Sequence, residues 1–219
     1  MNPEILLRYL PMYAMAALVT LKISAIGILI SFLIGFICSG VQYFRIPVLK
    51  QIVSAYIELS RNTPMLVQLF FIYFGLPKIG LAMSRETCAV AALAFLGGSY
   101  MAEAIRSGLE AVDVIQTESA VSLGMDRFQV MRFVVLPQAI AVAFPAIVAN
   151  VVFLIKETSV VSAIALADLM YVAKDLIGND YNTTEALFML VVFYLLILLP
   201  ISLLASLAER RIRYGGYGI

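Results

Sequence analysis

The side chains with the greatest chemical potential in this chain lie within or beside long apolar segments. Lys156 and Glu157 end an uncharged run, and Thr158 and Ser159 follow them directly. An ionisable group in an apolar segment is costly to bury, so by default it indicates a pathway or a binding site. The alternative is that Lys156 and Glu157 neutralise charges on neighbouring helices. The sequence leaves both interpretations of Glu157 open.

A second group of polar residues interrupts another apolar segment, at Asn62, Thr63 and Pro64. Proline removes a backbone hydrogen bond, and such breaks are tolerated where they line a polar cavity or are buried in protein. The break therefore either contributes to a pathway or is a packing kink. Tyr100, in a third apolar segment, either faces the same pathway or packs in the core.

Two acid–base pairs have the three-residue spacing that places both side chains on one helix face. Glu58 precedes Arg61, and Glu103 precedes Arg106. Glu58 and Arg61 can simply pair on one helix. For Glu103 and Arg106, a structural pair is the favoured interpretation.

The elements that must position these residues follow from the composition. Hydrophobic residues make up 63% of the 219 residues and charged residues 13%, whereas a soluble domain carries about 25% charged residues. The mean hydropathy is +0.99. A chain this apolar cannot hide its side chains in a small water-soluble core, so some of them must face lipid. The composition indicates an integral membrane protein.

Several kinds of chemistry are excluded by what the sequence lacks. It has no histidine, which removes histidine-based acid–base catalysis and histidine-ligated zinc or haem. The net charge of +1 without a basic block gives no sign of nucleic-acid binding. Cys38 and Cys88 are too few for a cysteine-rich metal site, and no P-loop motif occurs. Nucleotide hydrolysis and a metal site are therefore not expected on this chain.

Five segments can serve as transmembrane helices, since about 20 apolar residues cross the hydrocarbon core. The runs Ile23–Phe44, Phe133–Ile155 and Ala186–Ala208 contain no charge, and two shorter segments are bounded by charges. We expect an all-α integral membrane protein with a single transmembrane domain over residues 1–219. The expected spans are residues 12–41, 52–77, 86–109, 133–160 and 185–208.

Lysine and arginine in the short loops predict the orientation, because these residues accumulate on the cytoplasmic side. One side of the expected topology collects eight of them and the other side four. This predicts the N-terminus outside and the C-terminus inside, and it separates Cys38 from Cys88, so no disulfide is expected. The eight are Arg45, Lys50, Arg106, Arg127, Arg132, Arg210, Arg211 and Arg213, and the four are Arg8, Lys78, Arg85 and Lys174.

The loop between the third and fourth spans, residues 110–137, is too long and too regular for a simple turn. A first helix is predicted to end at Gly124. Asp126 and Gln129 then resemble a capping box that opens a second helix, which Pro137 interrupts or bends. On pattern alone, a surface hairpin that merely connects two spans is an equal alternative. The first helix has one face formed by Val112, Ile115, Ser119 and Leu123.

This loop also carries a resemblance to a known family. A string in this loop resembles the E-A-A-x3-G-x9-I-x-L-P signature of ABC importer permeases. It differs from that signature at two positions, with serine in place of the first alanine and valine in place of isoleucine. The matching positions are Glu118, Ser119, Ala120, Gly124, Val134, Leu136 and Pro137.

Four further strings narrow the resemblance to permeases of polar amino acids, of the histidine/glutamine/arginine type. Glu58–Pro77 resembles the second-span motif of that family and Tyr100–Gly108 its third-span motif. Leu136–Ala139 and Lys156–Ser159 continue the match through the fourth span. The resemblance covers roughly residues 15–210.

The resemblance implies a type I ABC importer with several subunits. Two permease subunits, identical or related, would lie side by side in the bacterial cytoplasmic membrane, above two ATPase subunits that bind ATP and magnesium. An extracytoplasmic amino-acid-binding protein would deliver the substrate. This chain would then not be an enzyme itself and would hold no cofactor. Besides these proteins and the amino-acid substrate, it would contact the lipid bilayer.

The resemblance also implies roles for particular residues. Ser119–Gly124 would form a coupling helix in a groove of the ATPase, where small side chains allow close docking and the Glu118 carboxylate offers charge-assisted hydrogen bonds. Independently of the resemblance, an amino acid carries an ammonium and a carboxylate, so Glu157 would receive the ammonium or a cationic side chain, and Thr158, Ser159 and backbone N–H groups would hold the carboxylate. The implied coupling residues are Glu118, Ser119, Ala120, Gly124, Leu136 and Pro137, and the candidate pathway residues are Glu157, Thr158, Ser159, Asn62, Thr63 and Tyr100.

An ion-coupled secondary amino-acid transporter is the alternative from another class. Such a protein needs ion-coupling residues and often an inverted repeat, and no repeat is apparent in this sequence. The expected outer loop before the fifth span contains four charged residues. In the importer they either steer docking of the binding protein or are ordinary solvated charges. The second interpretation is favoured for most of them. They are Asp168, Lys174, Asp175 and Asp180.

Overall fold

The computed structural model describes residues 3–216, and all regular secondary structure in this range is helical. Four stretches are long and apolar enough to cross a membrane, since a helix rises 1.5 Å per residue and the hydrocarbon core is about 30 Å thick. The expectation of an all-helical membrane protein is confirmed. The four stretches are Pro3–Tyr43, Arg85–Glu110, Arg127–Ile164 and Thr183–Ile212.

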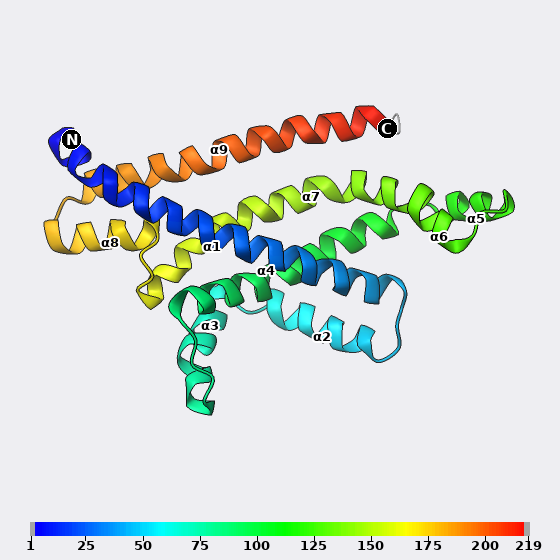
Figure 1. Cartoon of the computed structure of the whole chain (residues 1–219), viewed down its shortest axis with the longest axis horizontal. Coiled ribbons are helices and arrows are strands. Elements are labelled where there is room, and N and C mark those ends of the chain that lie inside the picture. Colours follow the sequence, from blue (N-terminus) through cyan, green and yellow to red (C-terminus); the bar gives the residue numbers. More distant parts are fainter. Residues whose placement is uncertain (1–2, 217–219) are drawn as a thin grey trace.

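The long helices run along the long axis of the molecule, with the two termini at opposite ends (Figure 1). Helix α1 (Pro3–Tyr43) packs along α4 (Arg85–Glu110), which in turn packs against α7 (Leu136–Glu157). Helix α9 (Thr183–Gly216) contacts α7 and α1 and leaves many leucines exposed. A surface of exposed leucines suits contact with lipid.

The second expected span, residues 52–77, is not one continuous helix. Helix α2 (Leu49–Arg61) folds back beside α1 and ends before Pro64. The chain then turns away from the bundle into α3 (Met65–Phe70), a π-helical turn and a 3₁₀ turn (Figure 1). The proline lies at the N-cap of α3, where a missing N–H breaks no helical hydrogen bond. The π-helical turn is Phe71–Gly75 and the 3₁₀ turn is Leu76–Ile79.

The contact of α4 with α7 requires a glycine near the C-terminal end of α4. A Cβ atom on Gly108 would meet the carbonyl oxygen of Ala139 and lie 2.7 Å from the Cβ of Ala143. Real Cβ atoms do not approach other atoms so closely, so only glycine permits this backbone contact. Further along α4, a core of buried side chains includes Leu93, Leu96 and Leu154.

The end of the molecule near the N-terminus is held by long-range hydrogen bonds. Helix α8 (Leu169–Asp180) follows the 3₁₀ segment Thr158–Ile164 and packs against α1 and α9. The Tyr9 hydroxyl donates to Asp180 at 2.6 Å, and the Tyr13 hydroxyl donates to the carbonyl of Ala186 at 2.6 Å.

Asp168 is a correction to the expected outer loop. Its side chain is fully buried and accepts hydrogen bonds from the backbone N–H groups of Met170 and Tyr171, so it caps α8. An N-cap carboxylate of this kind satisfies donors that the first turn of a helix leaves unpaired. It is not a solvated surface charge, whereas Lys174 and Asp175 are exposed.

The segment between α4 and α7 forms two short helices, as predicted. Helix α5 (Val114–Ser122) is followed by Gly124 with φ of 86°, and α6 (Arg127–Val130) opens with the Asp126–Gln129 capping box. Both local predictions are confirmed. Helices α5 and α6 lie beyond the bundle, at the end opposite the N-terminus (Figure 1).

Pro137 does not end the second helix. A π-helical turn over Met131–Val135 leads directly into α7, whose first turn contains the proline. The π-helical turn before the proline accommodates its missing N–H, so the helical path continues from Arg127 to Ile164. Of the predicted basic cluster near the C-terminus, Arg210 and Arg211 are exposed, and the Arg213 side chain lies outside the part that the structure describes.

Candidate functional site

The expected coupling residues lie on a surface that projects from the membrane bundle. Glu118 and Ser119 are exposed on α5, Ala120 is 5% exposed, and Gly124 is exposed after the helix. Leu136 and Pro137 are half-buried where α7 begins, so they support the loop from within. The motif thus divides into an outer part on α5 and an inner part at the start of α7.

The outer face of α5 and the residues after it expose several large apolar side chains. Leu123 is 84% exposed and Phe128, on α6, is 72% exposed. The other large exposed apolar side chains here are Val114, Ile115 and Val121. An exposed apolar patch with polar residues around it is typical of a protein–protein contact.

A small core attaches this segment firmly to the bundle. Ala120 and Val130 are buried together with Leu109 of α4 and with Val135 and Ala139 at the start of α7. Displacement of α5 must therefore move the adjoining ends of α4 and α7 with it, because packed interiors transmit displacement instead of absorbing it.

Three side chains donate hydrogen bonds to backbone carbonyls around the Pro64 break. Asn62 Nδ2 donates to the carbonyl of Glu58 at 2.8 Å, and Thr63 Oγ1 donates to the carbonyl of Leu59 at 2.8 Å. Gln68 Nε2 donates to the carbonyls of Ser60 and Thr63. Asn62 and Thr63 thus act at the C-terminal end of α2.

The break also borders an apolar hollow. Gln68 and Thr63 are its polar lining residues, and its volume is about 540 Å³. Gln68 Oε1 is buried and accepts no hydrogen bond from any residue that the structure describes. The other lining residues are Leu59, Val67, Phe71, Ile72, Leu76 and Phe95.

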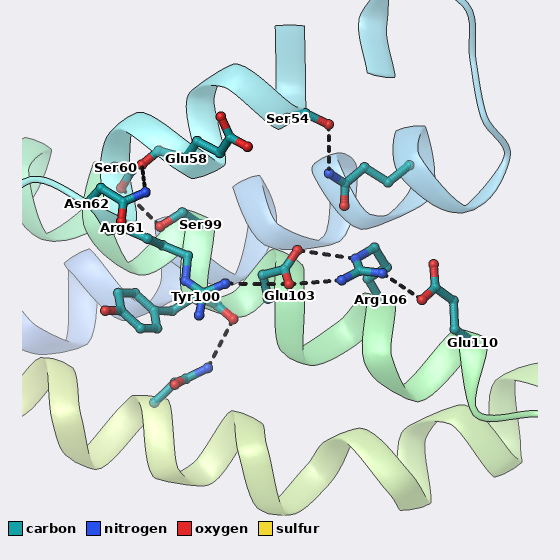
Figure 2. A network of polar contacts seen from close by, with 12 residues as sticks. Ser54, Glu58, Ser60, Arg61, Asn62, Ser99, Tyr100, Glu103, Arg106 and Glu110 are labelled. Atoms are coloured by element: carbon teal, nitrogen blue, oxygen red, sulfur yellow. Dashed lines mark hydrogen bonds and ion pairs between the residues drawn. The ribbon is translucent and has the colours of Figure 1, made fainter. Parts of the chain in front are cut away.

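Next to the break, a line of charged residues connects α2 to α4 (Figure 2). Arg61 Nη1 lies 3.5 Å from Glu103 Oε2, and Arg106 donates to Glu103 at 2.9 and 3.2 Å. Arg106 also donates to Glu110 at 2.6 Å. The predicted Glu103–Arg106 pair is confirmed. Glu58 is not the partner of Arg61, whose side chain crosses to Glu103 instead.

Tyr100 lies at the centre of this region. Its ring is beneath the Arg61 guanidinium, 5.2 Å from ring centroid to Cζ, and it contacts Phe153 of α7. Asn150 Nδ2 donates to the Tyr100 carbonyl at 3.1 Å. A guanidinium over an aromatic face is held by attraction to the π electrons, so Tyr100 and Glu103 together fix Arg61.

Buried hydroxyl groups continue the polar region on the far side of Arg61. Ser60 and Ser99 lie 2.9 Å apart between α2 and α4, and Tyr56 donates to the carbonyl of Phe95 at 2.6 Å. Because every one of these groups has a partner, the α2–α4 contact is polar without being destabilised.

The residues at the end of α7 form a separate group. Thr158 is buried and donates to the carbonyl of Ile155 at 2.7 Å, and Glu157 and Ser159 are half-buried. Neither Lys156 nor Glu157 forms an ion pair with another helix within residues 3–212. Asn150 and Glu157 are seven residues apart, so they lie on the same face of α7.

The structure thus brings Tyr100 together with Arg61, Glu103 and Asn150, and it places Glu157 two turns further along α7. The sequence contained a signal for the first group. Four polar residues of α4 recur at helical spacing on one face: Ser99, Glu103, Arg106 and Glu110. Within the described residues, no cluster of three or more metal-ligating side chains occurs.

Comparison with known proteins places this geometry in context. Residues 27–214 match the family described as "Binding-protein-dependent transport system inner membrane component". The chain is 35% identical, over 89% of its length and 89% of the relative, to the probable glutamine ABC transporter permease protein GlnP of Bacillus subtilis. It is 32% identical to the arginine transport system permease protein ArtQ of the same organism, over 89% and 90% of the two chains.

A solved structure agrees with these relatives. The crystal structure of an amino acid ABC transporter with histidines has a chain that superposes with a TM-score of 0.89 at 36% identity. The match covers 96% of this chain and 99% of the other. Similarity of this kind, over nearly the whole length of both chains, extends beyond any single motif.

Proposed function

This chain belongs to the binding-protein-dependent transport system inner membrane component family, and we propose from that premise that it carries polar amino acids across the bacterial inner membrane. It is a membrane component of an ABC importer, and in such a system ATP binding belongs to the partner ATPase. The similarity to permeases named for glutamine and arginine supports polar amino acids as the substrate class.

The proposed topology has five membrane crossings within a single domain, with the N-terminus outside and the C-terminus inside. Four crossings are the long apolar helices, and α2 with the segment after Pro64 makes the fifth. The positions of the termini at opposite ends of the bundle support an odd number of crossings (Figure 1). The excess of lysine and arginine at the α5 end supports its cytoplasmic position.

The proposed coupling contact is the exposed face of α5, with Glu118, Ser119 and Gly124 in the motif positions. The observation that carries this proposal is that α5 projects beyond the bundle with apolar side chains exposed, while Ala120 anchors it to α4 and α7. A partner that pushes on this face would tilt both long helices. Two ATPase subunits would bind beneath two permease subunits, which are identical or related.

The proposed pathway runs along α7 between the Arg61–Tyr100–Glu103 group and Glu157. This region contains acceptors for an ammonium group and donors for a carboxylate, which are the two ends of an amino acid. We assign Thr158 and Ser159 to its Glu157 end, and Asn62 and Thr63 to the break at its other end, where Thr63 lines the hollow. A substrate-binding protein would deliver the amino acid at the opposite end from α5.

The experiment that tests this function uses proteoliposomes with the permease, its ATPase and its binding protein. Radiolabelled glutamine, arginine and histidine are offered with ATP on the ATPase side, and separately with a sodium or proton gradient and no ATPase. We expect ATP-dependent accumulation of at least one of them. Accumulation driven by the ion gradient alone would support the secondary transporter instead.

A further inference from the structure

A polar recess and an apolar groove meet at the inner end of α1. Tyr43 lines both of them, the recess with a volume of about 290 Å³ and the groove with a volume of about 400 Å³. The groove runs between α1, α4 and α7, and the recess lies between the loop after α1 and the end of α4. Together they suit an amphipathic ligand, whose polar head would lie in the recess and whose apolar chain would lie in the groove.

The charges in the recess do not cancel. Arg106 is neutralised by its hydrogen bonds to Glu103 and Glu110, and Glu103 also pairs with Arg61. Arg45 and Lys50 line the same recess, and neither forms an ion pair or a side-chain hydrogen bond within the part of the chain that is described. Two unneutralised cations therefore face this space, which favours an anionic ligand.

The recess also contains an unsatisfied acceptor. Gln42 Nε2 donates to Ser54 Oγ at 3.4 Å, but Gln42 Oε1 is buried and has no partner among the described residues. A buried acceptor without a donor costs free energy. A ligand with both an anionic group and hydroxyl groups would satisfy the cations and this oxygen together.

The groove is suited to a hydrocarbon chain. Phe32 and Phe36 of α1 form one wall, Ile105 and Leu109 of α4 the floor, and Ile140 of α7 the other wall. Phe36 is 59% exposed, so the groove is open to the surroundings of the bundle.

The loop after α1 has the character of a segment at a membrane surface. Phe44 and Val48 are 64% and 68% exposed, and they flank Arg45. Arg45 and Val48 both have positive φ, at 51° and 66°, a backbone conformation that residues other than glycine rarely adopt. Apolar side chains interleaved with cations are typical of segments that lie in the headgroup region.

We propose that this recess and groove bind one anionic phospholipid with a hydroxyl-bearing headgroup, such as phosphatidylglycerol. The phosphate lies between Arg45 and Lys50, a headgroup hydroxyl donates to Gln42 Oε1, and one acyl chain lies in the groove. Basic pockets at this depth between transmembrane helices recognise lipid headgroups in other membrane proteins. Charge complementarity selects this occupant over a neutral lipid.

The test uses fluorescence, because the chain has no tryptophan. The full-length permease with Phe36→Trp is placed in phosphatidylcholine vesicles that contain increasing fractions of brominated phosphatidylglycerol or brominated phosphatidylcholine. Bromine quenches tryptophan at contact. We expect half-maximal quenching at a roughly five- to thirtyfold lower fraction of phosphatidylglycerol, since each basic side chain near the bilayer contributes about a fivefold factor.

Matched variants identify the cause of this preference. The double change Arg45→Gln and Lys50→Gln should remove it, while Arg45→Lys with Lys50→Arg should retain it. Phe74→Trp, an exposed position beyond the Pro64 break, should show no preference.

Three outcomes would each overturn the proposal. They are equal quenching by both lipids at Phe36→Trp, a preference that survives the double glutamine change, and no quenching by either lipid. The last result would indicate a groove covered by another protein chain. The readout is independent of uptake, so its failure leaves the transport proposal intact.

Discussion

Arg61 Nη1 of α2 lies 3.5 Å from Glu103 Oε2 of α4, and this pair joins the Pro64 break to the polar face of a long helix. The two side chains are 41% and 27% exposed, so the pair is neither buried nor freely solvated. Glu103 also accepts from Arg106, so it holds two cations in place. The pair therefore fixes the position of α2 relative to α4 beside the proposed pathway.

Replacing Glu103 with glutamine should destabilise the α2–α4 contact and reduce uptake. The change leaves Arg61 without its carboxylate, and we expect a loss of roughly 1–2 kcal/mol, below the ~3–5 kcal/mol of a fully buried pair because water screens these side chains. Thermal unfolding in detergent measures the stability, and initial uptake rates measure function.

The matched control is the Lys22–Glu86 pair, which joins α1 to α4 with both side chains more than half exposed. Glu86→Gln should change stability by about 0–1 kcal/mol and leave uptake unaffected. If the two glutamine variants unfold and transport alike, then Glu103 has no special role at the break.

Replacing Gly124 with valine should uncouple ATP hydrolysis from transport. A Cβ atom there meets nothing within 4 Å, so the change acts only through the φ of 86°. A β-branched residue in a left-handed conformation costs about 1–2 kcal/mol, which displaces the end of α5. We expect lower uptake per ATP hydrolysed in reconstituted complexes.

Gly124→Asn is the control for this position, because asparagine tolerates the left-handed conformation much better than valine does. The asparagine variant should retain most of the uptake per ATP hydrolysed. If the valine variant retains as much, then Gly124 has no role in coupling ATP hydrolysis to transport.

Replacing Glu157 with glutamine should weaken uptake of a cationic amino acid more than that of a neutral one. Loss of the charge converts a charge-assisted hydrogen bond into a neutral one, for which we expect a roughly tenfold rise in the KM for arginine. Competition between arginine and glutamine measures the difference. Lys156→Gln, at the exposed neighbouring position, is the control. Equal effects on both substrates would indicate a structural role for Glu157.

Asp168 should make the stability of the protein depend on pH. Burial raises the pKa of this carboxyl from 3.8 to about 6, although hydrogen bonds from Tyr171 and Met170 oppose the shift. The folded state thus holds the proton more tightly than the unfolded state, so stability is greatest below about pH 4 and falls as the pH rises through 6. The difference is on the order of 3 kcal/mol from this group.

Asp168→Asn retains a capping side chain and removes the titration. Its thermal unfolding temperature should vary less than that of the wild type between pH 4 and pH 7. Lys174 and Tyr194 are the other titratable side chains that interact with Asp168. An unchanged pH profile would show that they, or more distant groups, cause the dependence.

Local sequence signals predicted the parts of this fold that depend on neighbouring residues. Gly124 and the Asp126–Gln129 box specify their turns through backbone conformation and hydrogen bonds within a few residues, so they are visible in the sequence. The long apolar helices follow from composition in the same way. The motif that begins at Glu118 identified the permease family, because the spacing of its residues is specific to that family.

Features that depend on packing between distant segments were not predictable in this way. The three-residue spacing gave Arg61 a partner in Glu58, but the contact of α2 with α4 provides Glu103 instead. Asp168 looked like a loop charge because hydropathy does not reveal that its side chain is buried and caps α8. Pro137 was expected to interrupt or bend the second helix because a single sequence does not reveal the π-helical turn before it.

The most direct test of this account is whether the ATPase covers α5. Leu123 is 84% exposed there, and both natural cysteines are buried, so Leu123→Cys provides a single accessible thiol among the described residues. Maleimide labelling is compared in the permease alone and in the complex with its ATPase, with Ile79→Cys, 72% exposed and distant from α5, as the control. The account predicts that the ATPase protects Leu123→Cys strongly and leaves Ile79→Cys unchanged. Equal labelling of Leu123→Cys with and without the ATPase would contradict it.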